Sequence, residues 1–204
     1  MPKNKTATHE RIIQAAKKEF LEKGFERASI RVIAAQAGLT SAGLYRHFAD
    51  KEDMFAALVV PVLKEFHAYY DYFKDRDYAL LGKGALDAMW DDGKDTNVFL
   101  ELIYGNFEAF RLLICCSEGT RYANFVHDFV VMEQKETLAF LEEARRRGVS
   151  VKEIRPEELH LLISAYVTAI FEVVIHQFSK EDAMHYLKTL QTFFYPGWRT
   201  ILGI

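Results

Sequence analysis

The chain has 204 residues, of which 50% are hydrophobic and 27% are charged, with a formal net charge of −3. This length and apolar content suit one or two domains with a sizeable core. The first ten residues are polar and do not resemble a signal peptide. No uninterrupted apolar run is long enough to span a bilayer. We therefore expect a soluble, cytoplasmic protein and no membrane partner.

The charge is unevenly distributed along the chain. Residues 1–51 carry ten Lys/Arg and five Asp/Glu, a net charge of +5, whereas residues 52–204 carry a net charge of −8. We therefore expect only the N-terminal part to approach a polyanion.

Apolar residues recur at helical spacing almost throughout, and strand-like alternation is absent, so the predicted fold class is all-α. The first predicted helix runs from about Thr8 to Lys23. It has Ile12, Ala16 and Phe20 on one face, and Gly24 ends it.

The segment from Ser29 to Phe48 contains two short predicted helices joined by a tight turn. Ser29 is placed to cap the first helix, and Gly38 to end it in a left-handed conformation. Thr40 is placed to cap the second helix, whose buried side is Leu44 and Phe48. This plan is that of a helix-turn-helix, in which the second helix enters the major groove of DNA.

A longer helix is predicted from Lys51 to about Lys74, capped by Asp50 and kinked at Pro61, with a polar interval at 74–78 after it. Two or three short helices follow up to residue 117, and a long one spans about 120–147. Two more begin at about Pro156 and Lys180, the second broken or kinked at 196–197. Because these last two helices are apolar over more than one face, we expect them to pack against a second copy of the chain.

Residues 8 to about 58 resemble the DNA-binding domain of the TetR family of bacterial transcriptional regulators. The matching segments are RIIQAAKKEFLEKGF (Arg11–Phe25), AGLTSAGLYRHF (Ala37–Phe48) and DKEDMFAAL (Asp50–Leu58). The resemblance implies a three-helix helix-turn-helix domain over residues 1–50 and a helical-bundle ligand-binding and dimerisation domain over 51–204.

The resemblance also implies a mechanism. A homodimer would bind a palindromic operator in double-stranded DNA, most simply as a repressor, and a small effector of apolar or aromatic character would release it.

Candidate DNA contacts follow from the resemblance residue by residue. Tyr45 matches the family's phosphate-contacting tyrosine and Lys51 its phosphate-neighbouring lysine, although Lys51 could equally be a solvated surface charge. Many members have Lys-Gly where this chain has Ser41–Ala42, so the operator sequence cannot be borrowed from a relative. The full candidate set is Ser29, Arg31, Thr40, Ser41, Gly43, Tyr45, Arg46, His47 and Lys51.

The middle helices are rich in aromatic residues, as ligand cavities in helical bundles are, although aromatics at helical spacing also suit a plain core. The candidate ligand contacts are Tyr104, Phe107, Phe110, Phe125, Phe129 and Tyr166.

Enzyme motifs are absent from the sequence: it has no G-x-S-x-G, P-loop, H-E-x-x-H or zinc-spaced Cys/His cluster. We therefore predict no catalytic residue, metal site or cofactor. Two alternatives stay open. One is a metal, haem or thiol-redox sensor using Cys115, Cys116 or His127, and the other is a ligand-carrier module without DNA function.

Overall fold

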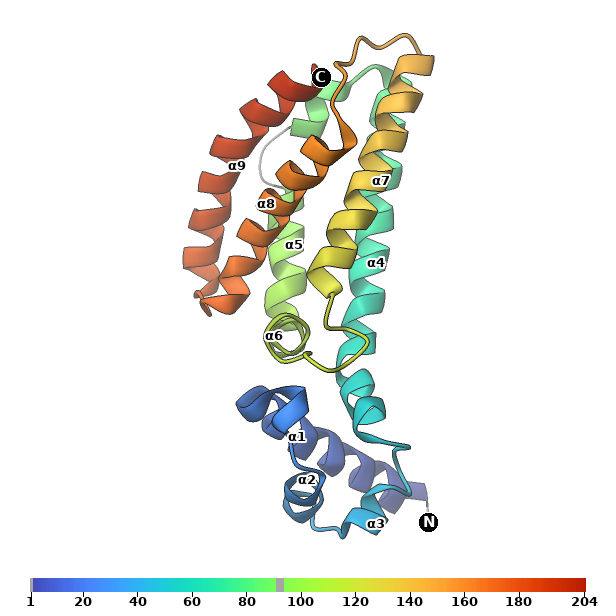
Figure 1. Cartoon of the computed structure of the whole chain (residues 1–204), viewed down its shortest axis with the longest axis vertical. Coiled ribbons are helices and arrows are strands. Elements are labelled where there is room, and N and C mark those ends of the chain that lie inside the picture. Colours follow the sequence, from blue (N-terminus) through green and yellow to red (C-terminus); the bar gives the residue numbers. More distant parts are fainter. Residues whose placement is uncertain (1, 91–93) are drawn as a thin grey trace. The chain divides into compact units, whose positions relative to one another are not determined.

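The computed structural model describes residues 2–90 and 94–204 (Figure 1). Within these ranges the chain is helical and contains no strand, which confirms the predicted all-α class. It forms two compact units: unit 1 comprises Met1–Glu65 with Asn106–Ala123, and unit 2 comprises Phe66–Gly105 with Asn124–Ile204.

Unit 1 packs short helices around an aromatic and aliphatic core. Its helices are α1 (Pro2–Arg27), α2 (Ile30–Gln36), α3 (Ser41–Leu44), the first part of α4 (Lys51–Lys83) and α6 (Phe107–Cys115). Ile12, Phe20, Ile33, Leu44 and Phe55 are completely buried there. The apolar stripe predicted for the first helix is therefore its core face.

Glycines interrupt the first helix of unit 1 and follow the second. Gly24 has φ 73° and ψ 163°, which interrupts the helical path within α1 as predicted. Gly38 follows α2 with φ 68°, and the N–H of Leu39 donates to the carbonyl of Ala34 at 2.8 Å. This left-handed cap is the one that the sequence predicted.

Side-chain caps fix where the next helices begin. Thr40 Oγ1 accepts the N–H of Gly43 at 3.1 Å and starts α3. At the start of α4, Asp50 Oδ1 accepts the N–H of Asp53 at 2.7 Å, and Asp53 Oδ2 accepts the N–H of Ala49 at 3.0 Å. Both predicted caps are confirmed, and the second is a reciprocal pair of the capping-box kind.

Unit 2 is a helical bundle. It contains the rest of α4, a 3₁₀ turn at Leu86–Trp90, α5 (Lys94–Gly105), α7 (Phe125–Arg146), α8 (Pro156–Ile175) and α9 (Lys180–Leu202). Helix α8 packs against both α7 and α9, and α5 packs against α9.

Three predicted helix boundaries are wrong. Helix α4 continues through the polar interval because its charges pair locally, Lys74 with Asp71 at 3.4 Å and Arg76 with Asp77 at 2.9 Å. Of the two alternatives predicted at Pro196, the break is wrong: helix α9 continues through this residue, since a proline costs one backbone hydrogen bond and the following turns still bury their apolar side chains. Helix α7 begins at residue 125 instead of 120, because residues 117–120 form a hydrogen-bonded turn.

The compact N-terminal unit extends to residue 65 and includes residues 106–123, so the functional boundary at residue 50 stays a prediction.

By length and composition alone, α8 is apolar enough to cross a membrane, which the sequence did not suggest. This helix carries Glu157, Glu158 and Glu172 and packs against α7 and α9, as core helices of bundles with similar composition do.

Candidate nucleic-acid interface and ligand cavity

The recognition helix is α3 with the turn that follows it, and it exposes one tyrosine while its apolar neighbours are buried. In α3 and the turn after it, Leu44 is completely buried and Phe48 is 4% exposed, whereas Tyr45 is 49% exposed. The backbone continues in hydrogen-bonded turns beyond α3, with the N–H of His47 donating to Leu44 at 2.9 Å. The predicted inward pair is confirmed, and the Tyr45 ring is available to a partner outside the chain.

The other candidate DNA contacts lie on α2, on α3 and in the adjoining turns. Arg31, Thr40 and Arg46 are exposed. Ser29, Ser41, Gly43 and His47 are half-buried. The ring of His47 lies 6.5 Å from that of His9, between ring centroids.

Ser29 does not cap α2 through its hydroxyl, so that prediction is wrong. Instead, its backbone N–H donates to Glu19 Oε1 at 3.0 Å. The Glu19 side chain comes from α1 and is only 5% exposed. A glutamate placed between Ala15, Ala16 and Phe20 on an apolar face was the sequence signal for this partner, and sequence reasoning missed it.

Lys51 has a structural role that the sequence did not predict. Its Nζ donates to the carbonyls of Glu26 at 3.1 Å and Ala28 at 3.3 Å, and it lies 4.5 Å from the ring centroid of Phe25. The lysine therefore ties the start of α4 to the end of α1. Because an ammonium group has three N–H donors, one remains for a phosphate.

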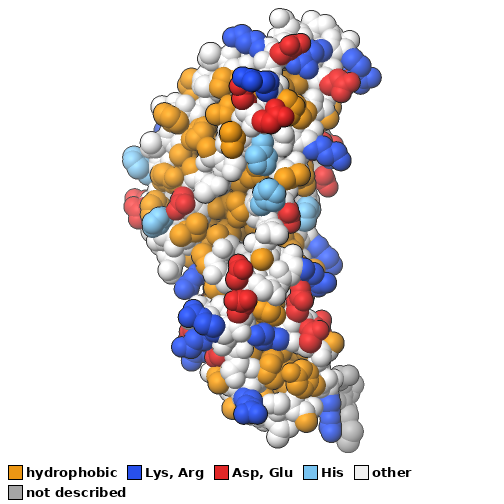
Figure 2. All heavy atoms as spheres, viewed as in Figure 1, with side chains coloured by type: hydrophobic (Ala, Val, Ile, Leu, Met, Phe, Trp, Pro, Cys, Tyr) orange, Lys and Arg blue, Asp and Glu red, His pale blue; other side chains and the backbone are white. Residues whose placement is uncertain are grey.

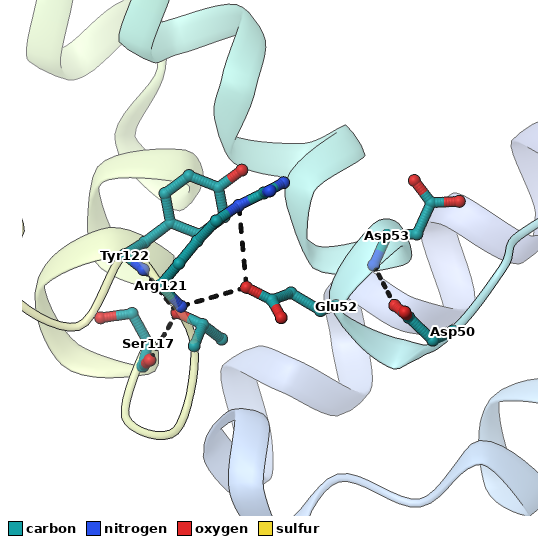
Figure 3. A network of polar contacts seen from close by, with 7 residues as sticks. Asp50, Glu52, Asp53, Ser117, Arg121 and Tyr122 are labelled. Carbon is teal, nitrogen blue, oxygen red and sulfur yellow. Dashed lines mark hydrogen bonds and ion pairs between the residues drawn. The ribbon is translucent and has the colours of Figure 1, made fainter.

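The segment from Asn106 to Ala123 is held to the rest of unit 1 by polar contacts (Figure 3). Glu52 Oε1 accepts the N–H of Arg121 at 3.0 Å and lies 3.7 Å from its guanidinium Nε. The carbonyl of Cys116 accepts the N–H of Phe25 at 2.9 Å. Gly119 has φ 82°, and a Cβ there would lie 2.8 Å from Glu26 Cγ, so this close approach requires glycine.

Unit 2 contains a cavity of about 360 Å³ that is partly open to solvent. Helices α4, α5, α7, α8 and α9 and the 3₁₀ turn contribute its walls. Tyr166 and Tyr195 are neighbours in the lining, and the rings of Trp90 and Tyr195 meet edge to face at 5.6 Å. The aromatic lining residues are Phe66, Tyr69, Tyr70, Phe73, Tyr78, Trp90, Phe99, Phe129, Phe140, Tyr166, Phe171, Tyr195 and Trp198.

The candidate ligand contacts are not all brought together. Phe129 and Tyr166 line the cavity, whereas Phe107 and Phe110 belong to unit 1. Tyr104 donates its hydroxyl to the carbonyl of Phe178 at 2.8 Å. Phe125 packs against Phe66 and Phe171 outside the lining, with ring centroids at 5.4 and 5.7 Å.

Charged residues also line the cavity, and sequence reasoning missed them. Burial, reinforced by the nearby carboxylates of Asp77 and Glu136, raises the pKa of Glu133 to about 7. Burial likewise raises the pKa values of Tyr70 and Tyr166, so both phenols are neutral hydrogen-bonding groups. The available signal was a glutamate four residues after Phe129 on the apolar face of α7.

The two cysteines differ in exposure, since Cys115 is exposed and Cys116 is buried. Burial raises the pKa of the Cys116 thiol, which lowers the thiolate fraction that redox chemistry uses. The described part of the chain brings together no group of three or more His, Cys, Asp or Glu side chains suited to a metal. Neither observation favours the thiol-redox or metal-sensing alternative.

A capped helix-turn-helix with an outward tyrosine, followed by a helical bundle, defines the class of DNA-binding transcriptional regulators. Comparison with known proteins agrees. The model of the bacterial regulatory proteins of the tetR family matches residues 12–58. The HTH-type transcriptional regulator SAB2452 of Staphylococcus aureus is 25% identical over 187 residues, which cover 89% of this chain and 100% of that protein.

Two further relatives are informative. The HTH-type transcriptional repressor BepR of Brucella suis is 40% identical over 52 residues, which cover 26% of this chain and 25% of that protein. The crystal structure of NalD, the secondary repressor of the MexAB-OprM multidrug efflux pump in Pseudomonas aeruginosa, shares the fold. It has a TM-score of 0.54 at 19% identity and covers 92% of this chain and 95% of that one. Residues 12–58 therefore form a DNA-binding domain of the kind found in the tetR family of bacterial regulatory proteins.

Proposed function

We propose that this chain is a cytoplasmic repressor that binds a palindromic operator as a homodimer and leaves it when a small molecule occupies the unit 2 cavity. The observation that carries the proposal is the recognition helix, whose Thr40 cap and buried Leu44 hold Tyr45 outward. The repressor role is supported by BepR and NalD, which are both described as repressors.

The DNA interface is proposed to combine backbone contacts with base contacts. Tyr45 and Lys51 contact phosphates, Arg31 and Arg46 are exposed cations, and His47 lies on the turn after α3. Ser29, Thr40, Ser41 and Gly43 lie at helix starts, where hydroxyls and N–H groups reach phosphate or base edges.

The proposed dimer interface is formed by α8 and α9. On α8, Leu161, Ala165, Thr168 and Ile175 form an exposed stripe at helical spacing, and Leu161 is 69% exposed. On α9, Phe193 is 76% exposed. Figure 2 shows apolar side chains gathered on the face of unit 2 where α8 lies. Such a surface fits a four-helix contact between two copies of the chain.

The experiment is selection of DNA fragments by the purified protein at moderate salt, followed by a screen for compounds that release them. We expect enrichment of a palindromic site whose half-sites lie about one helical turn apart or a multiple of it. Absence of any enriched palindrome would overturn the regulator proposal.

Two variants test the phosphate contacts on the selected site. Tyr45→Phe and Lys51→Ala should weaken binding to all sequences alike, and Lys51→Ala should also lower the slope of log affinity against log salt by about one unit. Lys64→Ala, an exposed lysine on the same helix, is the matched control and should leave the slope unchanged. Because Lys51 also ties α1 to α4, its variant is compared at temperatures where its far-UV spectrum matches the wild type. An unchanged slope would remove Lys51 from the interface.

A further inference from the structure

The cavity of unit 2 has more acidic than basic groups in its lining. Its acids are Asp77, Glu133 and Glu136, and its cations are Lys74 and Arg76. Both cations already have acidic partners: Lys74 pairs with Asp71, and Arg76 pairs with Asp77 at 2.9 Å. The guanidinium of Arg76 also lies 4.8 Å from the ring centroid of Phe73.

Glu133 is the acid without a counter-charge. The charged groups that act on its carboxyl are Asp77, which is itself paired with Arg76, and Glu136, and both are acidic. The residue lines the cavity and keeps some accessible surface, while protein atoms otherwise surround it. Ionising a buried carboxyl without a counter-charge costs free energy, and a positive group beside it reduces that cost.

Aromatic rings surround the same space. Tyr69 and Phe73 from α4 have ring centroids 4.4 Å apart, and Tyr70 and Phe129 meet edge to face at 5.9 Å. All four residues line the cavity with Glu133. The faces of such rings carry negative electrostatic potential and attract cations, most strongly where water is excluded.

We propose that the cavity of unit 2 takes a lipophilic organic cation, whose apolar body fills the aromatic lining and whose positive charge lies at Glu133. Naming this cation as the effector rests on the proposed function of the chain. The binding site itself rests only on the cavity, its rings and its unpaired acid.

Other ligand classes fit the lining less well. An organic anion would be placed among Glu133, Glu136 and Asp77 with no free cation to receive it. A neutral aromatic would fill the same volume and leave the Glu133 carboxyl without a counter-charge. A cation is therefore the class that completes the site electrostatically.

The test is calorimetric titration of the full chain with three probes that share a biphenyl body. They are (4-phenylbenzyl)trimethylammonium, 4-phenylbenzyl alcohol and 4-biphenylacetate. We expect the ammonium compound to bind at least about tenfold more tightly than the alcohol, and the acetate to bind most weakly. Equal affinity for the ammonium compound and the alcohol, or preference for the acetate, would overturn the proposal.

Two isosteric variants locate the charge. Glu133→Gln should reduce the preference for ammonium over alcohol from about tenfold to less than about threefold, while affinity for the alcohol stays unchanged. Glu142→Gln removes the same charge from an exposed position on the same helix, outside the lining, and should keep the full preference. Retention of the full preference in Glu133→Gln would remove this residue from the site.

The titration is done without DNA, so it separates the two proposals. Binding of the ammonium probe by a protein that enriches no operator would leave the cation site standing and overturn the regulator proposal. Enrichment of an operator by a protein that binds the ammonium probe no better than the alcohol would overturn the cation site alone.

Discussion

The two units differ in whether the chain itself supplies partners for their polar side chains. In unit 1, the buried Glu19 accepts the N–H of Ser29, and Lys51 donates to two carbonyls at the end of α1. In unit 2, Glu133 lines a cavity, and the charged groups that act on its carboxyl are the acids Asp77 and Glu136. The polar groups of the DNA-binding unit are therefore satisfied within the chain, whereas the cavity lacks a positive charge that a ligand can supply.

The aromatic residues differ in the same way. In unit 1, Phe20, Phe25 and Phe55 pack against one another with ring centroids 5.3 to 5.8 Å apart. In unit 2, the rings surround a cavity of about 360 Å³. Closely packed rings hold one geometry, whereas rings around a cavity leave room for a guest.

The largest expected effect comes from truncating one phenylalanine in each unit. Phe20→Ala opens a hole in a filled core and should lower the free energy of unfolding by about 4 kcal/mol. Phe129→Ala enlarges a cavity that already exists and should lower it by about 2 kcal/mol. Urea denaturation followed by far-UV circular dichroism measures both.

A conservative variant at residue 20 is the control for this comparison. Phe20→Leu keeps most of the volume and should cost about 1 kcal/mol. If the two alanine variants were equally destabilised, the contrast between a filled core and an open lining would be wrong.

The next effect concerns pH and Glu133. Its pKa is about 7 in the folded protein against an ordinary value of 4.5, so the folded state holds this proton more tightly than the unfolded state. The stability from this group is fully present below pH 4.5 and is lost as the pH rises through 7. Glu133→Gln cannot ionise and should therefore be more stable than the wild type by about 2 kcal/mol at pH values above about 8.

This difference should vanish in acid, where the wild-type carboxyl is protonated. Urea denaturation at a series of pH values follows it, with Glu142→Gln as the control because that residue is exposed. A constant difference between Glu133→Gln and the wild type over this range would contradict the raised pKa.

The smallest effect concerns the cap of the recognition helix. Thr40→Ala removes the acceptor for the N–H of Gly43 and should lower the stability of unit 1 by about 1 kcal/mol. Thr40→Ser keeps the hydroxyl and should restore nearly all of it. Hydrogen exchange of the Gly43 amide, measured by NMR, would show faster exchange in the alanine variant only. Unchanged exchange in Thr40→Ala would mean that the cap does not hold α3.

Local signals predicted most of unit 1. The spacing of Ile12, Ala16 and Phe20, the glycine stops and the Thr40 and Asp50 caps all act within a few residues, so the sequence displays them directly. The role of Lys51 was not predictable in this way. Its partners at Glu26 and Ala28 lie more than twenty positions earlier, and only the fold brings them together.

The cavity was harder to predict for the same reason. Periodicity identifies aromatic residues on apolar faces, but it does not show whether opposing helices fill the space between them. Phe110 and Phe129 therefore looked alike in sequence, although one is completely buried in unit 1 and the other lines the cavity of unit 2. Glu133 differed from its neighbours by its charge, and that signal alone could have marked the site.

Both tryptophans of the chain, Trp90 and Trp198, line the cavity, and unit 1 contains none. Tryptophan fluorescence, excited selectively, therefore reports on unit 2 and not on unit 1. A guest stacked against these rings would shift or quench that emission without any attached dye. The protein thus carries its own optical reporter of cavity occupancy, which can be read in the same cuvette in which fluorescently labelled DNA reports the state of unit 1.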